Sequence, residues 1–195
     1  IIVITGAGSG MGRAYALAQG VSPAVAAVIS EHYQPRGAED ASAASEAGAL
    51  VAIADRLDTL VGCFAIGQVP TGAADPLALR RATLGILRTV LAQGWDLSLQ
   101  AAVSAAYACY SGVTLDQDVV ATSQKLLQFF RDRLKGLLPQ PADVLEAVLA
   151  VAADRPLDAS LRARALAGID VETRATVGEV FKRAGNIAQG DVTCT

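Results

Sequence analysis

Apolar residues recur every three or four positions along most of the chain after residue 10, which is the spacing of helices packed on a core. No segment in this part of the sequence alternates apolar and polar residues with a period of two, as a half-buried strand does. The pattern therefore predicts an all-α fold. The clearest apolar stripe lies within residues 47–64 and comprises Ala47, Leu50, Ala54, Leu57, Val61 and Phe64.

Capping residues and breaks divide this pattern into separate helices. Ser22 followed by Pro23 predicts the start of a helix that ends near residues 34–37, and residues 38–46 are expected to be a loop or a frayed helix start. Asp75 followed by Pro76 predicts the start of a helix over about residues 76–92, packed on helix 47–64 across the loop between them. Other predicted helices span residues 97–110, 117–135, 142–153, 159–167 and 172–188, with Asp96, Asp158 and Asp170 as N-caps.

The composition predicts a protein with its own core in a reducing compartment. A length of 195 residues suffices for one domain, or for one domain and the start of another. The three cysteines form no CxxC or Cys/His pattern, which argues against disulfides and against a zinc site. The mean hydropathy is +0.39, yet no run reaches the roughly 18 apolar residues of a membrane span. We therefore expect a cytoplasmic protein with no membrane partner.

The net charge limits how the chain can bind nucleic acid. A charge of −3 and a pI near 5.1 exclude a generally basic binder, because proteins that neutralise many phosphates carry a basic surface. A local cluster of arginines is still compatible with these values. Any RNA-binding surface is therefore expected to be small and confined to such clusters.

A glycine-rich segment at the N-terminus indicates a different chemistry from the rest of the chain. Residues 1–12 form an apolar run followed by TGxxxGxG, with Gly6, Gly10 and Gly12 in place, and resemble the first strand and turn of a short-chain dehydrogenase. In such a turn, glycines let a pyrophosphate approach a helix N-terminus. An NAD(P)-binding dehydrogenase-like protein is therefore the alternative function, and it rests on residues 1–12 only.

The remainder of the sequence argues against this alternative. A dinucleotide-binding sheet needs several more parallel strands, and the sequence predicts helices instead. The Tyr-xxx-Lys pair of that family is also missing, because Tyr33, Tyr107 and Tyr110 are not followed by lysine four residues later. Residues 1–10 are more simply interpreted as a foreign N-terminal segment, and Ile1–Thr5 are expected to lack strand partners.

A second set of motifs covers nearly all of the chain in a fixed order. It includes the strings Met11–Leu17, Glu31–Arg36, Ala52–Gly62, Gly67-Gln68-x-Pro70-x-Gly72, Asp75–Ala82 with Gly85, Arg162–Leu166 and Lys182–Ile187. Together they resemble the β subunit of the bacterial two-subunit glycyl-tRNA synthetase over residues 11–190. The resemblance rests on many separate strings rather than on one short motif.

The resemblance implies a fold and a division into domains. It implies a helical bundle similar to an HD-type domain over residues 11–138, followed by a helical linker and the start of an anticodon-binding domain over residues 139–190. Residues 191–195 are expected to be a tail.

The resemblance also implies a function. In this family the α subunit holds the glycine and ATP site, and the β subunit contributes tRNA binding and subunit assembly to the ATP-dependent charging of tRNA with glycine. The implied partners are therefore the α subunit and tRNA. No cofactor is expected in this chain, since ATP and magnesium are used by the α subunit, and the isolated chain is expected to be inactive.

The candidate site residues fall into two groups. A structural signature is expected at Asp55, Asp58, Gly67, Gln68, Pro70, Gly72, Asp75 and Pro76. Arginine and lysine can hold phosphates by charge and hydrogen bonds. The candidates for tRNA binding are Arg80, Arg81, Lys182, Arg183 and Asn186.

Two questions about these residues remain open from the sequence. Arg80 or Arg81 can equally form an ion pair with Asp55, Asp58 or Asp75 and so fix the loop rather than bind RNA. Adjacent helical residues lie about 100° apart around the axis, so one of the two arginines should point towards Asp55 or Asp58 and the other towards solvent. No catalytic or metal site is predicted, because HD-type hydrolases need several histidines and this chain has only His32.

Overall fold

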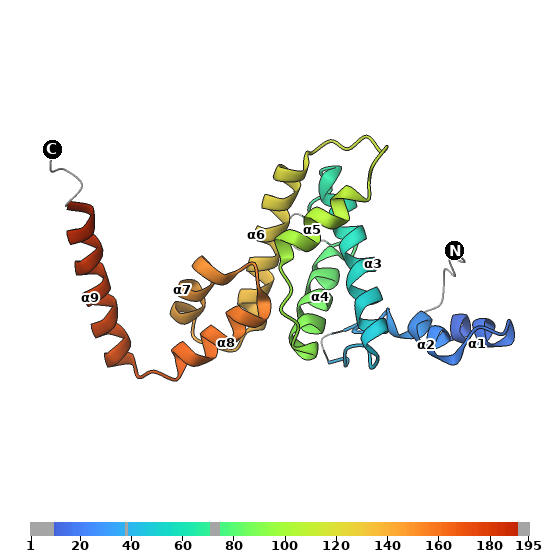
Figure 1. The fold of residues 1–195 in the computed structure, drawn as a ribbon, viewed down its shortest axis with the longest axis horizontal. Helices are drawn as coiled ribbons and strands as arrows, with labels where there is room; N and C mark the ends of the chain where they lie inside the picture. The colour runs from blue at the N-terminus through green and yellow to red at the C-terminus, as the bar shows by residue number, and fades with distance from the viewer. Residues whose placement is uncertain (1–9, 38, 71–74, 191–195) are drawn as a thin grey trace.

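Every element in the part of the chain that the computed structural model describes, residues 10–37, 39–70 and 75–190, is an α-helix (Figure 1). The all-α prediction is confirmed for these residues, whereas the prediction for Ile1–Thr5 lies outside them. The helices are α1 (Met11–Ala18), α2 (Pro23–Glu31), α3 (Glu46–Ala65), α4 (Leu79–Gln93), α5 (Leu99–Ala108), α6 (Val119–Leu137), α7 (Ala142–Ala152), α8 (Pro156–Ala167) and α9 (Val171–Gly190).

Helix α3 is the centre of the bundle. It packs against α4, α5 and α6, and the end of α2 joins it from the other side (Figure 1). The predicted packing of the helices at 47–64 and 76–92 is therefore confirmed by the contact of α3 with α4. The buried apolar side chains of these helices form one continuous core, in which burial of apolar surface supplies the main stabilisation.

The buried face of α3 differs from the predicted stripe in its first half. Leu57, Val61 and Phe64 are buried as predicted, but Ala47, Leu50 and Ala54 are exposed. Counting back from Leu57 in steps of four reaches Ile53 and Ala49, and these are the residues that are buried. The prediction followed the wrong face of the helix over its first two turns.

Aromatic residues anchor the contact between α3 and α6. Phe64 and Phe129 meet edge to face with ring centroids 5.1 Å apart, and Phe130 is fully buried. Trp95 is half-buried and packs against the same core. These aromatic residues therefore belong to the core or pack directly on it.

Three predicted helix starts are displaced. Helix α5 begins after Ser98, whose hydroxyl accepts a hydrogen bond from the Ala101 amide, and not after Asp96. Helix α8 begins at Pro156, so Asp158 lies inside the first turn, where its carboxylate pairs with Arg162 at 2.7 Å. Helix α4 begins at Leu79 rather than near residue 76, because Asp75 accepts hydrogen bonds from amides four and five residues later.

The two ends of the described chain leave the bundle. Helices α1 and α2 pack on each other and project from one end, and α9 stands apart at the other end (Figure 1). Asp170 caps α9 as predicted, accepting a 2.8 Å hydrogen bond from the Thr173 amide. None of the helices described is long and apolar enough to span a bilayer.

Candidate functional site

The signature loop leaves α3 through a glycine turn. Gly67 adopts a left-handed conformation with φ of 74°, its amide donates to the carbonyl of Phe64, and the Gln68 amide donates to the carbonyl of Cys63 at 2.8 Å. This is the Schellman arrangement, in which a glycine ends a helix and satisfies its last carbonyl groups. Gly67 and Gln68 therefore end α3 and direct the chain into the loop. Gly72 lies outside the described residues.

Asp75 fixes the other end of the loop onto α4. Its two carboxylate oxygens accept hydrogen bonds from the amides of Leu79 at 2.8 Å and Arg80 at 3.0 Å, and its carbonyl accepts from the amide of Ala78. Ala78 itself has a left-handed φ of 57°. A carboxylate at the first amides of a helix is also favoured by the helix dipole. The direction in which Arg80 and Arg81 leave the loop is therefore set by Asp75.

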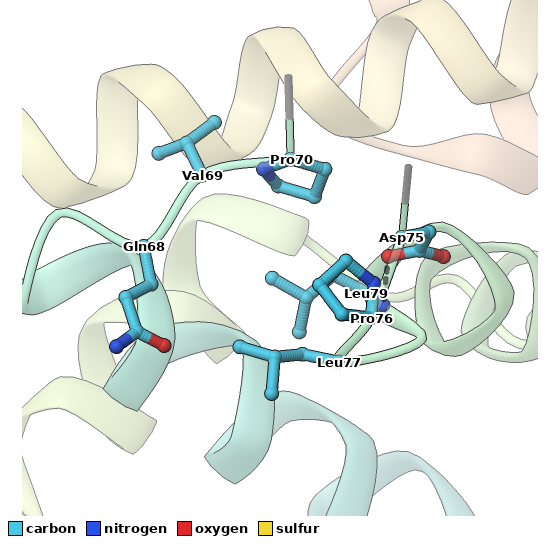
Figure 2. A pocket seen from close by; sticks show the side chains of 7 residues that line it. All are labelled: Gln68, Val69, Pro70, Asp75, Pro76, Leu77 and Leu79. Carbon is cyan, nitrogen blue, oxygen red and sulfur yellow. Dashed lines mark hydrogen bonds between the residues drawn. The ribbon is translucent and has the colours of Figure 1, made fainter. Parts of the chain in front are cut away.

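A small apolar hollow of about 300 Å³ lies beside this loop (Figure 2). Figure 2 shows Val69 and Pro70 on one side of it and Pro76, Leu77 and Leu79 on the other. The signature residues Gln68, Pro70, Asp75 and Pro76 thus lie around one space. Their side chains offer apolar contact and no free cation, so this hollow by itself is not a phosphate site.

Arg80 is half-buried and lies near a second guanidinium group. Burial lowers the pKa of Arg133 on α6, and the charge of Arg80 lowers it further. The carboxylates of Asp132 and Asp75 act in the opposite direction. The Arg133 guanidinium sits 3.7 Å from the centre of the Phe129 ring, a cation–π contact that holds it in place. Two guanidinium groups therefore lie close to the carboxylate of Asp75.

Arg81 is exposed and lies on a different surface from Arg80. It lines a second hollow of about 300 Å³, between the end of α2, α3 and the start of α4, which we call the α2–α4 hollow. The lining of this hollow includes His32, Tyr33, Arg36, Asp55, Arg56 and Arg81. Within the described residues, the guanidinium groups of Arg36 and Arg81 form no hydrogen bond or ion pair.

The ion pairs that the sequence suggested for Asp55 and Asp58 are absent from the described part of the chain. Asp55 lines the α2–α4 hollow together with Arg81, but no carboxylate oxygen of Asp55 lies within 4 Å of a guanidinium nitrogen of Arg81. Asp58 does not line this hollow, and its carbonyl accepts a 2.9 Å hydrogen bond from the hydroxyl of Tyr110. The structure therefore brings Asp55 and Arg81 together, but not Asp58. The RNA-binding roles of Arg80 and Arg81 stay predictions.

Arg56, which lies between these two aspartates, holds backbone rather than carboxylates. Its guanidinium donates hydrogen bonds of 3.0 to 3.2 Å to the carbonyls of Ala52, His32, Tyr33 and Pro35. Burial lowers its pKa, and Asp55 offsets this effect. Arg56 thus fixes the segment after α2 against α3, which builds one wall of the α2–α4 hollow.

Gly85 makes room for this arginine. A Cβ atom on Gly85 would lie 2.7 Å from Nε of Arg56, which is closer than Cβ atoms approach other side chains. Sequence reasoning gave no role to Arg36 and missed the clamp formed by Arg56 and Gly85. The available signal was that Arg36, Arg56 and Gly85 all belong to the motif strings, although no spacing rule links them.

The candidates on α9 lie far from those on α4. Lys182, Arg183 and Asn186 are exposed, and α9 stands at the opposite end of the bundle from α1 (Figure 1). The structure does not bring these residues together with Arg80 or Arg81. If both groups bind RNA, they must contact separate parts of it.

The described residues contain no cluster suited to metal chemistry. No group of three or more His, Cys, Asp or Glu residues lies together in this part of the chain. His32 lies at the end of α2, where its Nδ1 is 3.2 Å from the carbonyl of Val28. Cys63 and Cys109 are free thiols, and burial raises the pKa of Cys63.

Comparisons with a family model and with curated proteins both find similarity over most of this chain. The family model for the glycyl-tRNA synthetase beta subunit matches residues 7–150. The glycine–tRNA ligase beta subunit of Myxococcus xanthus is 46% identical over 189 residues, which cover 92% of this chain and 26% of that protein. The corresponding subunits of an Anaeromyxobacter species and of Geotalea uraniireducens are each 44% identical, covering 92% and 93% of this chain and 26% and 27% of those proteins. The chain spans about a quarter of the length of these relatives.

Proposed function

Because the chain belongs to the family of the glycyl-tRNA synthetase beta subunit, we propose that it contributes tRNA binding and subunit assembly to a glycine–tRNA ligase. In this proposal the α subunit is the partner that uses glycine, ATP and magnesium, and this chain holds no cofactor of its own. The tRNA and the α subunit are its binding partners, and the cytoplasm is its location. The chain acts by positioning RNA rather than by reacting with it.

One observation carries the RNA-binding part of the proposal. Arg80 and Arg81 are adjacent in the first turn of α4, and the Asp75 carboxylate fixes this turn. Arg81 is exposed, and its guanidinium group makes no hydrogen bond or ion pair within the described chain. A pre-positioned guanidinium group can bind a phosphate through two parallel hydrogen bonds. Lys182, Arg183 and Asn186 supply a second exposed polar group on α9.

The dehydrogenase-like alternative has no support. The family match begins at residue 7 and so includes Gly10 and Gly12 of the glycine-rich segment. In the described chain Gly12 is buried within α1, a helix packed on α2, and no strand is present to extend a sheet.

The division into an HD-like bundle over 11–138 and a helical linker with the start of an anticodon-binding domain over 139–190 remains part of the proposal. In the structure α7 packs on α6 and α8, α8 also packs on α4, and α9 stands apart.

Mutation of Arg80 and of Arg81 on α4 tests the proposal. We expect Arg81→Ala to leave the free energy of unfolding within about 0.5 kcal/mol, because its side chain is exposed, and to weaken binding of glycine tRNA. Arg80→Ala should lower the free energy of unfolding by about 1–3 kcal/mol, because Arg80 is half-buried beside Asp75. Fluorescence anisotropy of labelled tRNA with the purified chain, at low and at raised salt, measures the binding.

Arg13→Ala is the matched control, since Arg13 is exposed on α1 and its removal changes the net charge equally. It should reduce affinity less than Arg81→Ala does. The proposal is contradicted if the chain does not bind tRNA at low salt, or if neither arginine variant of α4 changes the affinity.

A further inference from the structure

The α2–α4 hollow contains two cations that the fold does not use. Arg36 comes from the segment after α2 and Arg81 from α4, and both line the hollow with exposed side chains. Within the described residues their guanidinium groups make no hydrogen bond or ion pair, whereas Arg56 in the same hollow is committed to backbone carbonyls. Two free guanidinium groups against the single carboxylate of Asp55 favour an anionic ligand.

The same hollow also presents an aromatic surface. The rings of His32 and Tyr33 lie with centroids 4.0 Å apart and tilted by 39°, and both side chains are half-buried at the hollow wall. The segment that carries them is held by the hydrogen bonds of Arg56 to the carbonyls of His32 and Tyr33. The rings are therefore fixed in position before any ligand arrives, which lowers the entropic cost of binding.

We propose that the α2–α4 hollow binds one unpaired nucleotide of RNA, with its phosphate at Arg36 and Arg81 and its base against the His32–Tyr33 pair. A phosphate alone would not need the aromatic surface. Sequence-tolerant binding of unpaired nucleotides uses this combination of arginines with stacking rings. The Asp55 carboxylate can accept a hydrogen bond from a base, and it would repel the side chains of an acidic peptide. The volume of about 300 Å³ lies at the lower end for ligand sites, which restricts the occupant to a single nucleotide.

This inference rests on the proposed function, because the RNA it describes is the tRNA. It adds that an unpaired region of the RNA, rather than a helical stem, enters the hollow. Bases inside an A-form helix have both faces stacked on neighbours, so they cannot contact a ring pair unless they are unpaired.

The test compares single-stranded and paired RNA on the purified chain. We expect a fluorescein-labelled single-stranded RNA hexamer to bind more tightly than a labelled, blunt-ended RNA duplex that is long enough to remain fully paired. Tyr33→Leu should weaken hexamer binding by about 5-fold or more, the loss expected for one stacked base, and Tyr33→Phe should restore it. Arg36→Ala and Arg81→Ala should each weaken binding more than Arg13→Ala, whose charge change is the same.

A second measurement needs no variant and so does not depend on the stability of Tyr33→Leu. A hexamer carrying 2-aminopurine should lose fluorescence when it binds, because the probe base stacks on a ring. The nucleotide site is overturned if the hexamer binds without loss of fluorescence, if tripolyphosphate competes as well as the hexamer does, or if a poly-glutamate peptide competes equally well. If the hexamer fails to bind while tRNA binding still depends on Arg81, this inference fails and the proposed function stands. If tRNA also fails to bind, the proposed function fails too.

Discussion

At the residue scale, several glycines on the central helices leave space for side chains that come from other elements. They do not lie in turns. A Cβ on Gly62 would lie 2.5 Å from the hydroxyl of Tyr110, and a Cβ on Gly48 would collide with Glu31. In each case the incoming side chain joins two elements: Tyr110 bonds the carbonyl of Asp58, and Glu31 accepts hydrogen bonds from the amide and hydroxyl of Ser45. These helical positions therefore need glycine because a side chain from another element passes close to the backbone, and not because the backbone adopts an unusual conformation.

Gly85 gives the sharpest residue-level prediction. Gly85→Ala places a methyl group against Arg56 and forces its guanidinium away from the carbonyls it holds. We expect the free energy of unfolding to fall by about 1–3 kcal/mol, because part-buried hydrogen bonds from a charged group are lost. Urea denaturation followed by circular dichroism measures the change.

The control for this variant is Gly136→Ala on α6, where a Cβ meets nothing within 4 Å. Alanine is the better helix former, so this change should leave stability unchanged or raise it by up to about 1 kcal/mol. Equal unfolding free energies for the two variants would contradict the role assigned to Gly85.

At the element scale, α3 and α9 differ although each has 20 residues. The apolar positions Val177, Val180 and Phe181 of α9 follow helical spacing, which predicts a packed face. In the structure these side chains are 46%, 60% and 74% exposed, whereas α3 is surrounded by other helices. The periodicity of α9 shows that it can pack, and only the tertiary structure shows that nothing in the described chain covers it.

Hydrogen exchange should separate these two helices. A helix without tertiary contacts is only marginally stable in water, so the amides of residues 171–190 should exchange rapidly by local opening. The amides in the middle of α3 should exchange only through global unfolding, at rates lower by several orders of magnitude. Mass spectrometry of the exchanging chain provides the comparison, and similar protection in both helices would refute it.

At the scale of the whole molecule, the chain is a helical bundle with one projecting helix pair and one separate helix (Figure 1). The basic candidates lie on different parts of this shape: Arg81 beside the α2–α4 hollow, and Lys182 and Arg183 on α9. The net charge of the chain is negative, but RNA binding needs only local groups of cations. The chain has such candidates beside the α2–α4 hollow and on α9.

The whole chain is expected to lack chemistry of its own. We expect the purified protein to show neither NAD(P)-dependent turnover nor glycine-dependent exchange of pyrophosphate into ATP. The first expectation follows from the missing Tyr-xxx-Lys pair, and the second from the proposal that the α subunit holds the activating site. A complete two-subunit synthetase, assayed in parallel, serves as the positive control. Glycine-dependent exchange by this chain alone would disprove the second expectation.

The sequence by itself determined the helical class, most helix positions and the family. These features are local or additive: apolar spacing, capping residues such as Asp170, and motif strings read in order are all encoded by near neighbours. Where local signals competed, the sequence was insufficient. Asp96 and Ser98 both suit a helix start; in the structure Ser98 caps α5 and Asp96 instead forms an ion pair with Arg155.

Only the tertiary structure decided which distant residues meet. Arg56 has Asp55 and Asp58 beside it in the sequence, yet it binds carbonyls more than twenty residues earlier, because the fold brings that segment against α3 and leaves its carbonyls without helical partners. Arg36, Tyr33 and Arg81 come together in the α2–α4 hollow for the same reason. No periodicity encodes such contacts, because they depend on how three separate elements pack in space.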